Sequence, residues 1–154
     1  MFRNLFLATL FLLIYACSQA DNLDLSDNYL TEKVIYQSKN VYGFENLFEG
    51  RIHSQTNQDV FGILHFPENY DASIQYPLVI ASHGSSNWRD HHRRYLEQIR
   101  QADYIVFAIH PFDSRDVSST VGNQINVTSE TVIYEMAQAL NLLSKDPRIN
   151  NQKI

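Results

Sequence analysis

Two short runs of consecutive apolar residues, with a helical stretch between them, constrain the fold of this chain most strongly. Residues Pro77–Ser82 and Tyr104–Ile109 are apolar at almost every position. Consecutive apolar residues favour strands that are covered on both faces, as in a parallel sheet shielded by crossover helices. Between the two runs, apolar residues at helical spacing predict a helix from about Asp90 to Ala102. The chain is therefore expected to belong to the α/β class.

Further elements flank this central unit. Lys33–Gln37, Asn46–His53 and Asp59–Phe66 are candidate strands, and Asp59–Phe66 is the clearest of the three because both of its faces are largely apolar. A second helix is expected to begin with Thr128 or Ser129 as its cap and to end at Asp146-Pro147. Its expected apolar positions are Val132, Ile133, Met136, Ala137, Leu140 and Leu143. The order of elements predicts a mostly parallel sheet with crossover helices.

The first residues have the pattern of an export signal. Arg3 is followed by an apolar run of twelve residues, Leu5–Ala16. A helix of that length covers about 18 Å, which is short of the roughly 30 Å hydrocarbon core of a membrane, so a signal-peptide core fits better than a membrane span. Residues 1–17 are therefore assigned as a signal peptide, and polar residues 18–32 as a flexible tether. Residues 33–154 form the expected folded domain.

Cys17 is the only cysteine of the chain and stands at the end of the apolar run. It has no intramolecular disulfide partner. Ile14-Tyr15-Ala16-Cys17 resembles a lipobox, in which a cysteine after a small residue is lipidated, although Tyr15 departs from the usual small residue. The resemblance implies lipidation at Cys17 and attachment to a membrane in a bacterial cell envelope or periplasm. Plain secretion and an uncleaved anchor are the alternatives.

Composition and charge exclude other classes of function. With a formal net charge of −5, the chain has no excess of positive charge that could neutralise a row of phosphates, so a nucleic-acid partner is not expected. His91 and His92 are neighbours on a helix and point about 100° apart, and the sequence has no histidine or cysteine pair at zinc-binding spacing. Neither a metal site nor a cofactor is predicted.

The motifs at the ends of the two apolar runs carry a resemblance to a known family. Leu78–Ser82 followed by His83-Gly84-Ser85 resembles the third strand and oxyanion loop of α/β-hydrolases. Tyr104–Arg115 resembles the next strand and its loop in dienelactone-hydrolase-like members, and Asp146–Ile154 resembles the linker that leads to their nucleophile strand. The resemblance covers roughly residues 45–154 and lies in the order of the motifs rather than in any one of them.

The resemblance implies a site for carbonyl chemistry. Ester hydrolysis passes through a tetrahedral oxyanion, which backbone N–H groups can stabilise. In the family the residue after His-Gly supplies one donor, which here is the amide of Ser85. Gly84 is expected to allow a sharp turn without a Cβ in the way, and His83 to support the loop by a hydrogen bond. The interpretation requires residues 77–82 to form a buried parallel strand; if they lie at the edge of the sheet or in a helix, the hydrolase assignment is lost.

The family's catalytic residues have no counterpart in this sequence. None of the five glycines belongs to a G-x-S-x-G motif, and the family's nucleophile, acid and base all follow the point that Ile154 matches. We therefore expect the N-terminal part of a serine-type hydrolase for carboxylic esters or related carbonyl substrates, truncated before the nucleophile elbow and inactive by itself. Whether the nucleophile is Ser or Cys stays open. A non-catalytic envelope lipoprotein that uses the fold as a binding module is the alternative, and a shortened, unstable remnant without activity is a third.

Four further residues near these motifs have two interpretations each. Trp88 either flanks the acyl pocket or packs over the first helix, and His110 either lines the substrate pocket or closes its strand. Asp113 and Arg115 are expected to form a local salt bridge that holds the loop; contact with a small-molecule substrate is the other interpretation.

Overall fold

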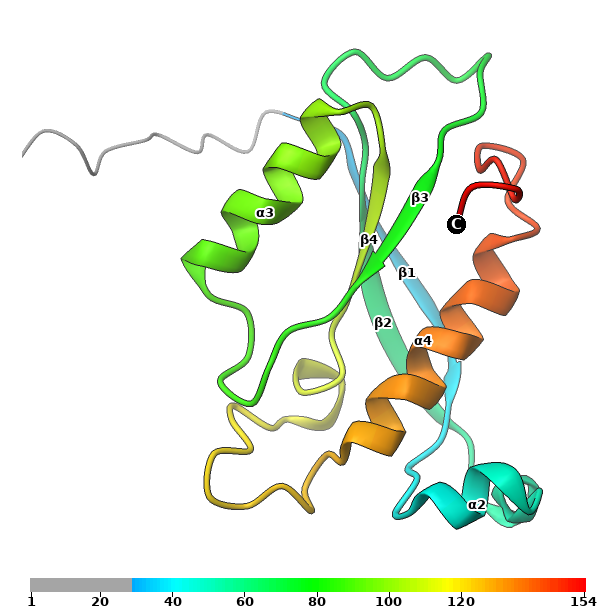
Figure 1. Cartoon of the computed structure of the whole chain (residues 1–154), viewed down its shortest axis with the longest axis vertical. Coiled ribbons are helices and arrows are strands. Elements are labelled where there is room, and N and C mark those ends of the chain that lie inside the picture. The colour runs from blue at the N-terminus through cyan, green and yellow to red at the C-terminus, as the bar shows by residue number, and fades with distance from the viewer. Residues whose placement is uncertain (1–28) are drawn as a thin grey trace, which may run out of the picture.

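The computed structural model describes residues 29–154, apart from the side chains of residues 53 and 54. Its elements, shown in Figure 1, are β1 (Thr31–Ser38), α2 (Phe44–Phe48), the 3-10 helix η1 (Arg51–Ser54), β2 (Gln58–His65), β3 (Leu78–Ala81), α3 (Asp90–Gln101), β4 (Ile105–Ile109), the 3-10 helix η2 (Asp113–Arg115) and α4 (Ser129–Leu143). The predicted signal peptide, Cys17 and most of the predicted tether lie outside the described residues. No helix within residues 29–154 is long and apolar enough to cross a membrane.

The four strands form one mixed sheet in the order β1-β2-β4-β3. β3 and β4 are parallel, whereas β2 is antiparallel to both β1 and β4. The prediction of a mostly parallel sheet is therefore wrong. Apolar residues on both faces of a strand show that the sheet is covered, but they do not fix the direction of its neighbours. β2 and β3 are joined by residues 66–77, which contain no helix.

β3 lies at one edge of this sheet, and this position contradicts the expectation of a fully buried strand. Leu78 is buried, but Val79, Ile80 and Ala81 are only partly covered. On the open side, Tyr76 forms a parallel bridge with Ile149. Next to it, the Leu78 N–H donates to the carbonyl of Lys153 over 2.9 Å. Residues 148–153 thus flank the beginning of β3. The edge position fails the condition that the sequence interpretation set, so the hydrolase assignment no longer follows from the sequence.

Helices cover the two faces of the sheet. Figure 1 shows α3 on one side of the strands and α4 on the other. All five residues of β4 are buried, because this strand lies between β2 and β3 and packs against α3. Phe107 of β4 lies directly over Gly62 of β2, where an added Cβ would come within 2.3 Å of the ring. Ala139 and Leu143 of α4 close the same core.

The strand predicted for Asn46–His53 does not form. Residues 44–48 form α2 and residues 51–54 form η1, with Gly50 between them in the left-handed conformation at φ 68°. Phe44 and Phe48, four residues apart, stack on one face of α2 with ring centroids 6.3 Å apart. The interruption at Gly50 is incompatible with a continuous strand, because an extended chain requires a negative φ.

Helix α4 begins and ends close to its predicted bounds, but only part of its predicted apolar stripe faces the core: Leu143 is buried, and Val132 and Met136 pack against the core. The side chain of Thr128 caps the helix by accepting a hydrogen bond from the Thr131 N–H over 3.1 Å. The residues of the helix that are buried are Thr131, Glu135, Ala139 and Leu143, whereas Ile133 and Leu140 of the predicted apolar stripe are exposed. The polar members of the buried face have specific partners, which the next section describes.

Candidate functional site

The carboxyl ends of β3 and β4 bring the two loops of interest to one edge of the sheet. The strands are parallel and in register with Ala81 opposite Ala108. The loops that begin at Ser82 and at His110 therefore leave the sheet side by side. In open α/β sheets this is the edge at which ligands bind.

The loop after β3 makes a tight turn at residues 84–87. The Asn87 N–H donates to the Gly84 carbonyl over 3.0 Å, and Asn87 itself is left-handed at φ 65°. Gly84 does not adopt a positive φ, and a Cβ placed on it would meet nothing within 4 Å. The turn itself therefore does not require glycine at position 84; Asn87 is the residue in the unusual conformation, which asparagine tolerates better than most residues.

His83 is 9% exposed and holds the carbonyl of the next residue. Its Nδ1 lies 2.8 Å from the Gly84 oxygen, so Nδ1 carries the proton and donates. Burial lowers the pKa of His83 below 6.5; the hydrogen bond to Gly84 opposes this shift but does not outweigh it. The ring is thus neutral at neutral pH, and its buried Nε2 has no hydrogen-bond partner among the described groups.

The amide of Ser85 is oriented by this arrangement. In a trans peptide the carbonyl and the following N–H point in opposite directions. Because His83 and Asn87 both donate to the Gly84 carbonyl, the Ser85 N–H points away from them, and no acceptor within residues 29–154 pairs with it. The Ser85 carbonyl is fixed separately, since it accepts from the Thr120 N–H and the Ser119 hydroxyl, both at 2.9 Å.

Aromatic and imidazole rings surround the turn. Trp88 donates its indole N–H to the Ile109 carbonyl over 3.0 Å, which ties the loop to the end of β4. Its ring contacts His83 edge-on, with centroids 5.4 Å apart, and also His92 in the first turn of α3. His110, the first residue after β4, stacks on Phe61 with centroids 4.9 Å apart. Trp88 and His110, both candidates for the substrate pocket, thus lie together at this edge of the sheet, with their ring centroids 6.0 Å apart.

Asp113 connects His110 to the turn. One carboxylate oxygen lies 2.6 Å from His110 Nδ1, and the other accepts from the Asn87 side-chain amide over 2.8 Å. Burial by itself would raise the pKa of Asp113, but the hydrogen bonds from His110 and Asn87 outweigh it and lower that pKa. The carboxylate is therefore ionised at neutral pH. The expected salt bridge between Asp113 and Arg115 does not form.

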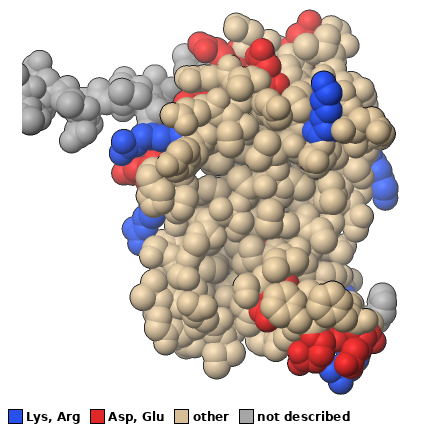
Figure 2. Space-filling view, viewed as in Figure 1, with Lys and Arg blue, Asp and Glu red and all other residues tan. Residues whose placement is uncertain are grey.

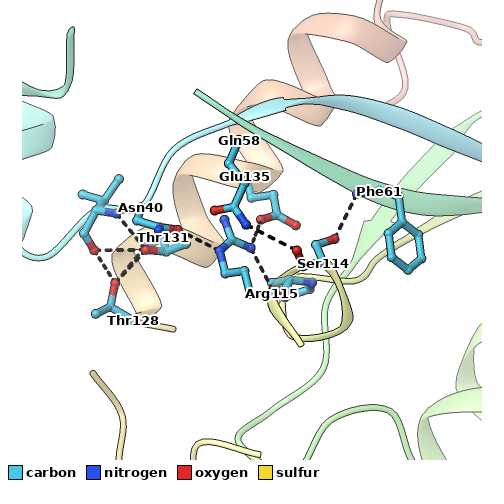
Figure 3. Close-up of polar contacts among 10 residues, drawn as sticks. Asn40, Gln58, Phe61, Ser114, Arg115, Thr128, Thr131 and Glu135 are labelled. Atoms are coloured by element: carbon cyan, nitrogen blue, oxygen red, sulfur yellow. Dashed lines mark hydrogen bonds and ion pairs between the residues drawn. The ribbon is translucent and has the colours of Figure 1, made fainter. Parts of the chain in front are cut away.

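Arg115 instead forms a buried ion pair with Glu135 of α4. Figure 3 shows the guanidinium between Asn40 and Glu135, to which it donates over 2.8 Å each. The Glu135 side chain is 0% exposed and that of Arg115 is 6% exposed. Burial raises the pKa of Glu135, and the nearby Arg115 charge opposes that shift only in part. This pair fixes the loop after β4 to the helix that covers the sheet.

Two more contacts in Figure 3 anchor the same region. The Ser114 hydroxyl accepts from the Phe61 N–H over 3.1 Å, and Thr131 binds the backbone of Val41 from the buried face of α4. A hollow of about 510 Å³ beside this network is lined by polar groups that include Asn40, Gln58 and Asp116. Within the described part of the chain, no group of three or more His, Cys, Asp or Glu side chains is placed to hold a metal ion.

The structure brings together His83, Gly84, Ser85, Trp88 and His110 at one edge, whereas Cys17 lies outside the described residues. The sequence interpretation missed Asn87, Asp113 in its present role and Glu135. The Asn87 signal was available, because asparagine is a common residue at positive φ in turns. Glu135 had no signal, because a glutamate within a helix is normally taken as solvent-exposed.

Comparisons with known proteins add a weak likeness of fold. No protein-family model matches the chain. No curated protein matches it either. Similar solved structures include a hypothetical protein of Pseudomonas aeruginosa, 14% identical with a TM-score of 0.43, over 80% of this chain and 34% of that one. A proposed dienelactone hydrolase of Klebsiella pneumoniae is 13% identical with a TM-score of 0.45, over 75% of this chain and 45% of that one.

A proposed dipeptidyl aminopeptidase IV of Bacteroides ovatus is 14% identical with a TM-score of 0.43, over 83% of this chain and 18% of that one. This chain therefore spans less than half the length of each of these structures. Likeness at this level carries no argument about activity, so the function proposed below depends on the geometry of the site.

Proposed function

We propose that this chain supplies the oxyanion loop of a serine-type hydrolase that acts on carboxylic esters or related carbonyl substrates. The observation that carries the proposal is the amide of Ser85. It follows the parallel strand β3, it is oriented by two hydrogen bonds to the Gly84 carbonyl, and it has no acceptor of its own within the described residues. An ordered, unpaired N–H at the carboxyl end of a strand is the group that a developing oxyanion requires.

In the proposed reaction, a nucleophile attacks the substrate carbonyl carbon and the carbonyl oxygen becomes negatively charged. The Ser85 N–H donates a hydrogen bond to that oxygen while the tetrahedral intermediate exists. Collapse of the intermediate expels the alcohol and leaves an acyl-enzyme, which water then hydrolyses. The nucleophile, acid and base are proposed to lie in sequence beyond these 154 residues, in which G-x-S-x-G is absent.

The surface around β3 is compatible with a further segment packing there. Figure 2 shows almost no charged side chain across the middle of the face that carries β3, whereas charged groups gather toward its margins. The bridge between Tyr76 and Ile149 already starts a parallel pairing on the open side of β3. A strand that continued this pairing would bring its carboxyl end next to Ser85.

The test compares two variants of the protein translated from the complete reading frame. Ser85→Pro removes the N–H, whereas the matched control Ser85→Ala keeps it. We expect the proline variant to lose about 10²-fold or more of kcat for p-nitrophenyl ester hydrolysis and the alanine variant to stay within a few-fold of the parent. Full activity in a folded proline variant would show that Ser85 is not an oxyanion donor.

A non-catalytic envelope lipoprotein is the second candidate, favoured by the lack of a nucleophile elbow in the sequence. The codons after Ile154 distinguish the two: G-x-S-x-G within about ten residues supports the enzyme, and a continuation without a Ser or Cys nucleophile supports the binding module. We also propose that Cys17 carries a lipid in a bacterial cell envelope. Fatty-acid labelling that persists in Cys17→Ser would contradict that proposal.

A further inference from the structure

We propose that Asp113 is a positioning residue for the Ser85 amide and acts through Asn87. What this positioning is for rests on the proposed function, whereas the hydrogen bonds themselves do not depend on any activity. No contact between Asp113 and a substrate is required. A chain of hydrogen bonds runs from His110, at the end of β4, through Asp113 to Asn87 in the turn at residues 84–87.

The first step is the conformation of Asn87. Its φ of 65° is unfavourable for a residue with a side chain, so the turn needs other interactions to keep it there. Both ends of its side-chain amide are used. The oxygen accepts from the Trp88 N–H over 2.7 Å, and the nitrogen donates to Asp113 over 2.8 Å. Asn87 is thereby held from both sides.

The second step is what Asn87 does for the turn. Its backbone N–H is one of the two donors to the Gly84 carbonyl, and the peptide that contains this carbonyl also contains the Ser85 N–H. If Asn87 leaves the left-handed conformation, this donor moves and the Gly84 carbonyl is held by His83 alone. The direction of the Ser85 N–H therefore depends on the conformation of Asn87.

The third step is the fixed position of Asp113. It lies in η2, which follows β4 after residues 110–112, and its second oxygen is 2.6 Å from His110 Nδ1. His110 is in turn stacked on Phe61 of β2, and Arg115 joins the same short helix to Glu135 of α4. The carboxylate is thus attached to the sheet and to α4, whereas the turn that it holds is exposed at Gly84 and Ser86. Asp113 therefore connects the exposed turn to residues that are held in place by the sheet and by α4.

The test uses Asp113→Ala, with Asp113→Asn as a variant of nearly unchanged volume and Glu68→Ala as a control at an exposed carboxylate. Hydrogen exchange of the Asn87 backbone amide in the full chain reports on the turn directly. We expect Asp113→Ala to speed this exchange about 5- to 10-fold, as loss of a partly exposed charged hydrogen bond implies, with Asp113→Asn in between. Exchange in β4 and in Glu68→Ala should stay at the parental rate.

A double variant distinguishes an effect of Asp113 through Asn87 from a general loss of order in the loop. Glycine adopts a positive φ without strain, so in an Asn87→Gly background the turn no longer needs the Asp113 contact. There, Asp113→Ala should change exchange at residues 85–87 less than twofold. An equal effect in both backgrounds would show that Asp113 does not act through Asn87. Exchange within twofold of the parent in the single variant would overturn the proposal as well.

The kinetic arm uses the protein from the complete reading frame. Asp113→Ala should lower kcat about 5- to 10-fold with KM within twofold of the parent, because the donor is needed most in the transition state. An unchanged kcat in an active protein contradicts the positioning role. If the parental protein hydrolyses no ester at all, the proposed function fails, while the exchange measurements still decide whether Asp113 positions the turn.

Discussion

Replacing Arg115 by methionine should be the most damaging single substitution of a charged residue in the described fold. The substitution keeps an apolar stem of similar length but leaves Glu135, which is 0% exposed, without its counter-ion. It also removes the donors to Asn40 and to the Pro111 carbonyl. Breaking a buried ion pair from one side typically costs about 3–5 kcal/mol, because a buried charge is left uncompensated.

The size of this loss should depend on pH. Without Arg115 the pKa of Glu135 rises further above 4.5, because burial is then unopposed. A group whose pKa is raised in the folded state binds more protons there than in the unfolded state. The free energy of unfolding of Arg115→Met should therefore recover as pH falls toward 4.5 and should be lowest at neutral and higher pH.

Urea denaturation followed by circular dichroism at pH 5 and pH 7.5 measures both effects. The matched control is the double variant Arg115→Met with Glu135→Leu, which removes both charges and should lie within about 1–2 kcal/mol of the parent. A loss below about 1 kcal/mol for the single variant at pH 7.5, or an equal loss at both pH values, would refute the reasoning.

Two further predictions concern glycines and a buried histidine. Gly62→Ala should destabilise the chain by about 1–3 kcal/mol, because its Cβ would lie 2.3 Å from the Phe107 ring, whereas Gly84→Ala should change the melting temperature little; equal melting temperatures would contradict this. The pKa of His83 is lowered in the folded state, so the unfolded chain takes up a proton first and stability should fall as pH drops below 6.5. His83→Gln should lose less stability between pH 7.5 and pH 5.5 than the parent, and parallel curves would show that His83 does not titrate in this way.

The strands with the most apolar sequences were predicted well. The parallel direction of β3 and β4 was predicted correctly, whereas the antiparallel direction of β2 was not. Four of the predicted strands correspond to β1, β2, β3 and β4 within one or two residues. For β2, β3 and β4 the reason is that apolar residues on both faces reflect burial on both faces. The direction of a strand depends on the path of the connections. The sequence between the strands contains no signal that distinguishes a mixed sheet from a parallel one, and the edge position of β3 follows from the same missing information.

Helix α4 shows how buried polar residues mislead a sequence pattern. Its length and its cap at Thr128 were predicted from local signals. Its buried face was predicted only in part, because the predicted stripe lacks Glu135, which pairs with Arg115, twenty residues earlier in the chain. The exposed Ile133 and Leu140 then occupy positions that a polar surface would normally fill. A contact between distant residues decides which face a helix buries.

The position of the candidate site was predicted from the sequence, but the hydrogen bonds that orient its residues were not. The residues His83, Gly84 and Ser85 were selected from their place after an apolar strand, and the structure puts them at the carboxyl end of β3. The interactions that orient them come from Asn87 and Asp113, which are 26 residues apart in sequence. Only the parallel register of β3 with β4 brings these two side chains together.

The most direct test of the central claim is the amide resonance of Ser85 in the protein from the complete reading frame, before and after reaction with a serine-directed phosphonate. The phosphonyl oxygen of the adduct stands in for the oxyanion of the tetrahedral intermediate. If Ser85 is an oxyanion donor, its amide proton moves downfield as a new hydrogen bond forms, and its hydrogen exchange slows. An adduct that leaves the Ser85 resonance and its exchange unchanged would contradict the account.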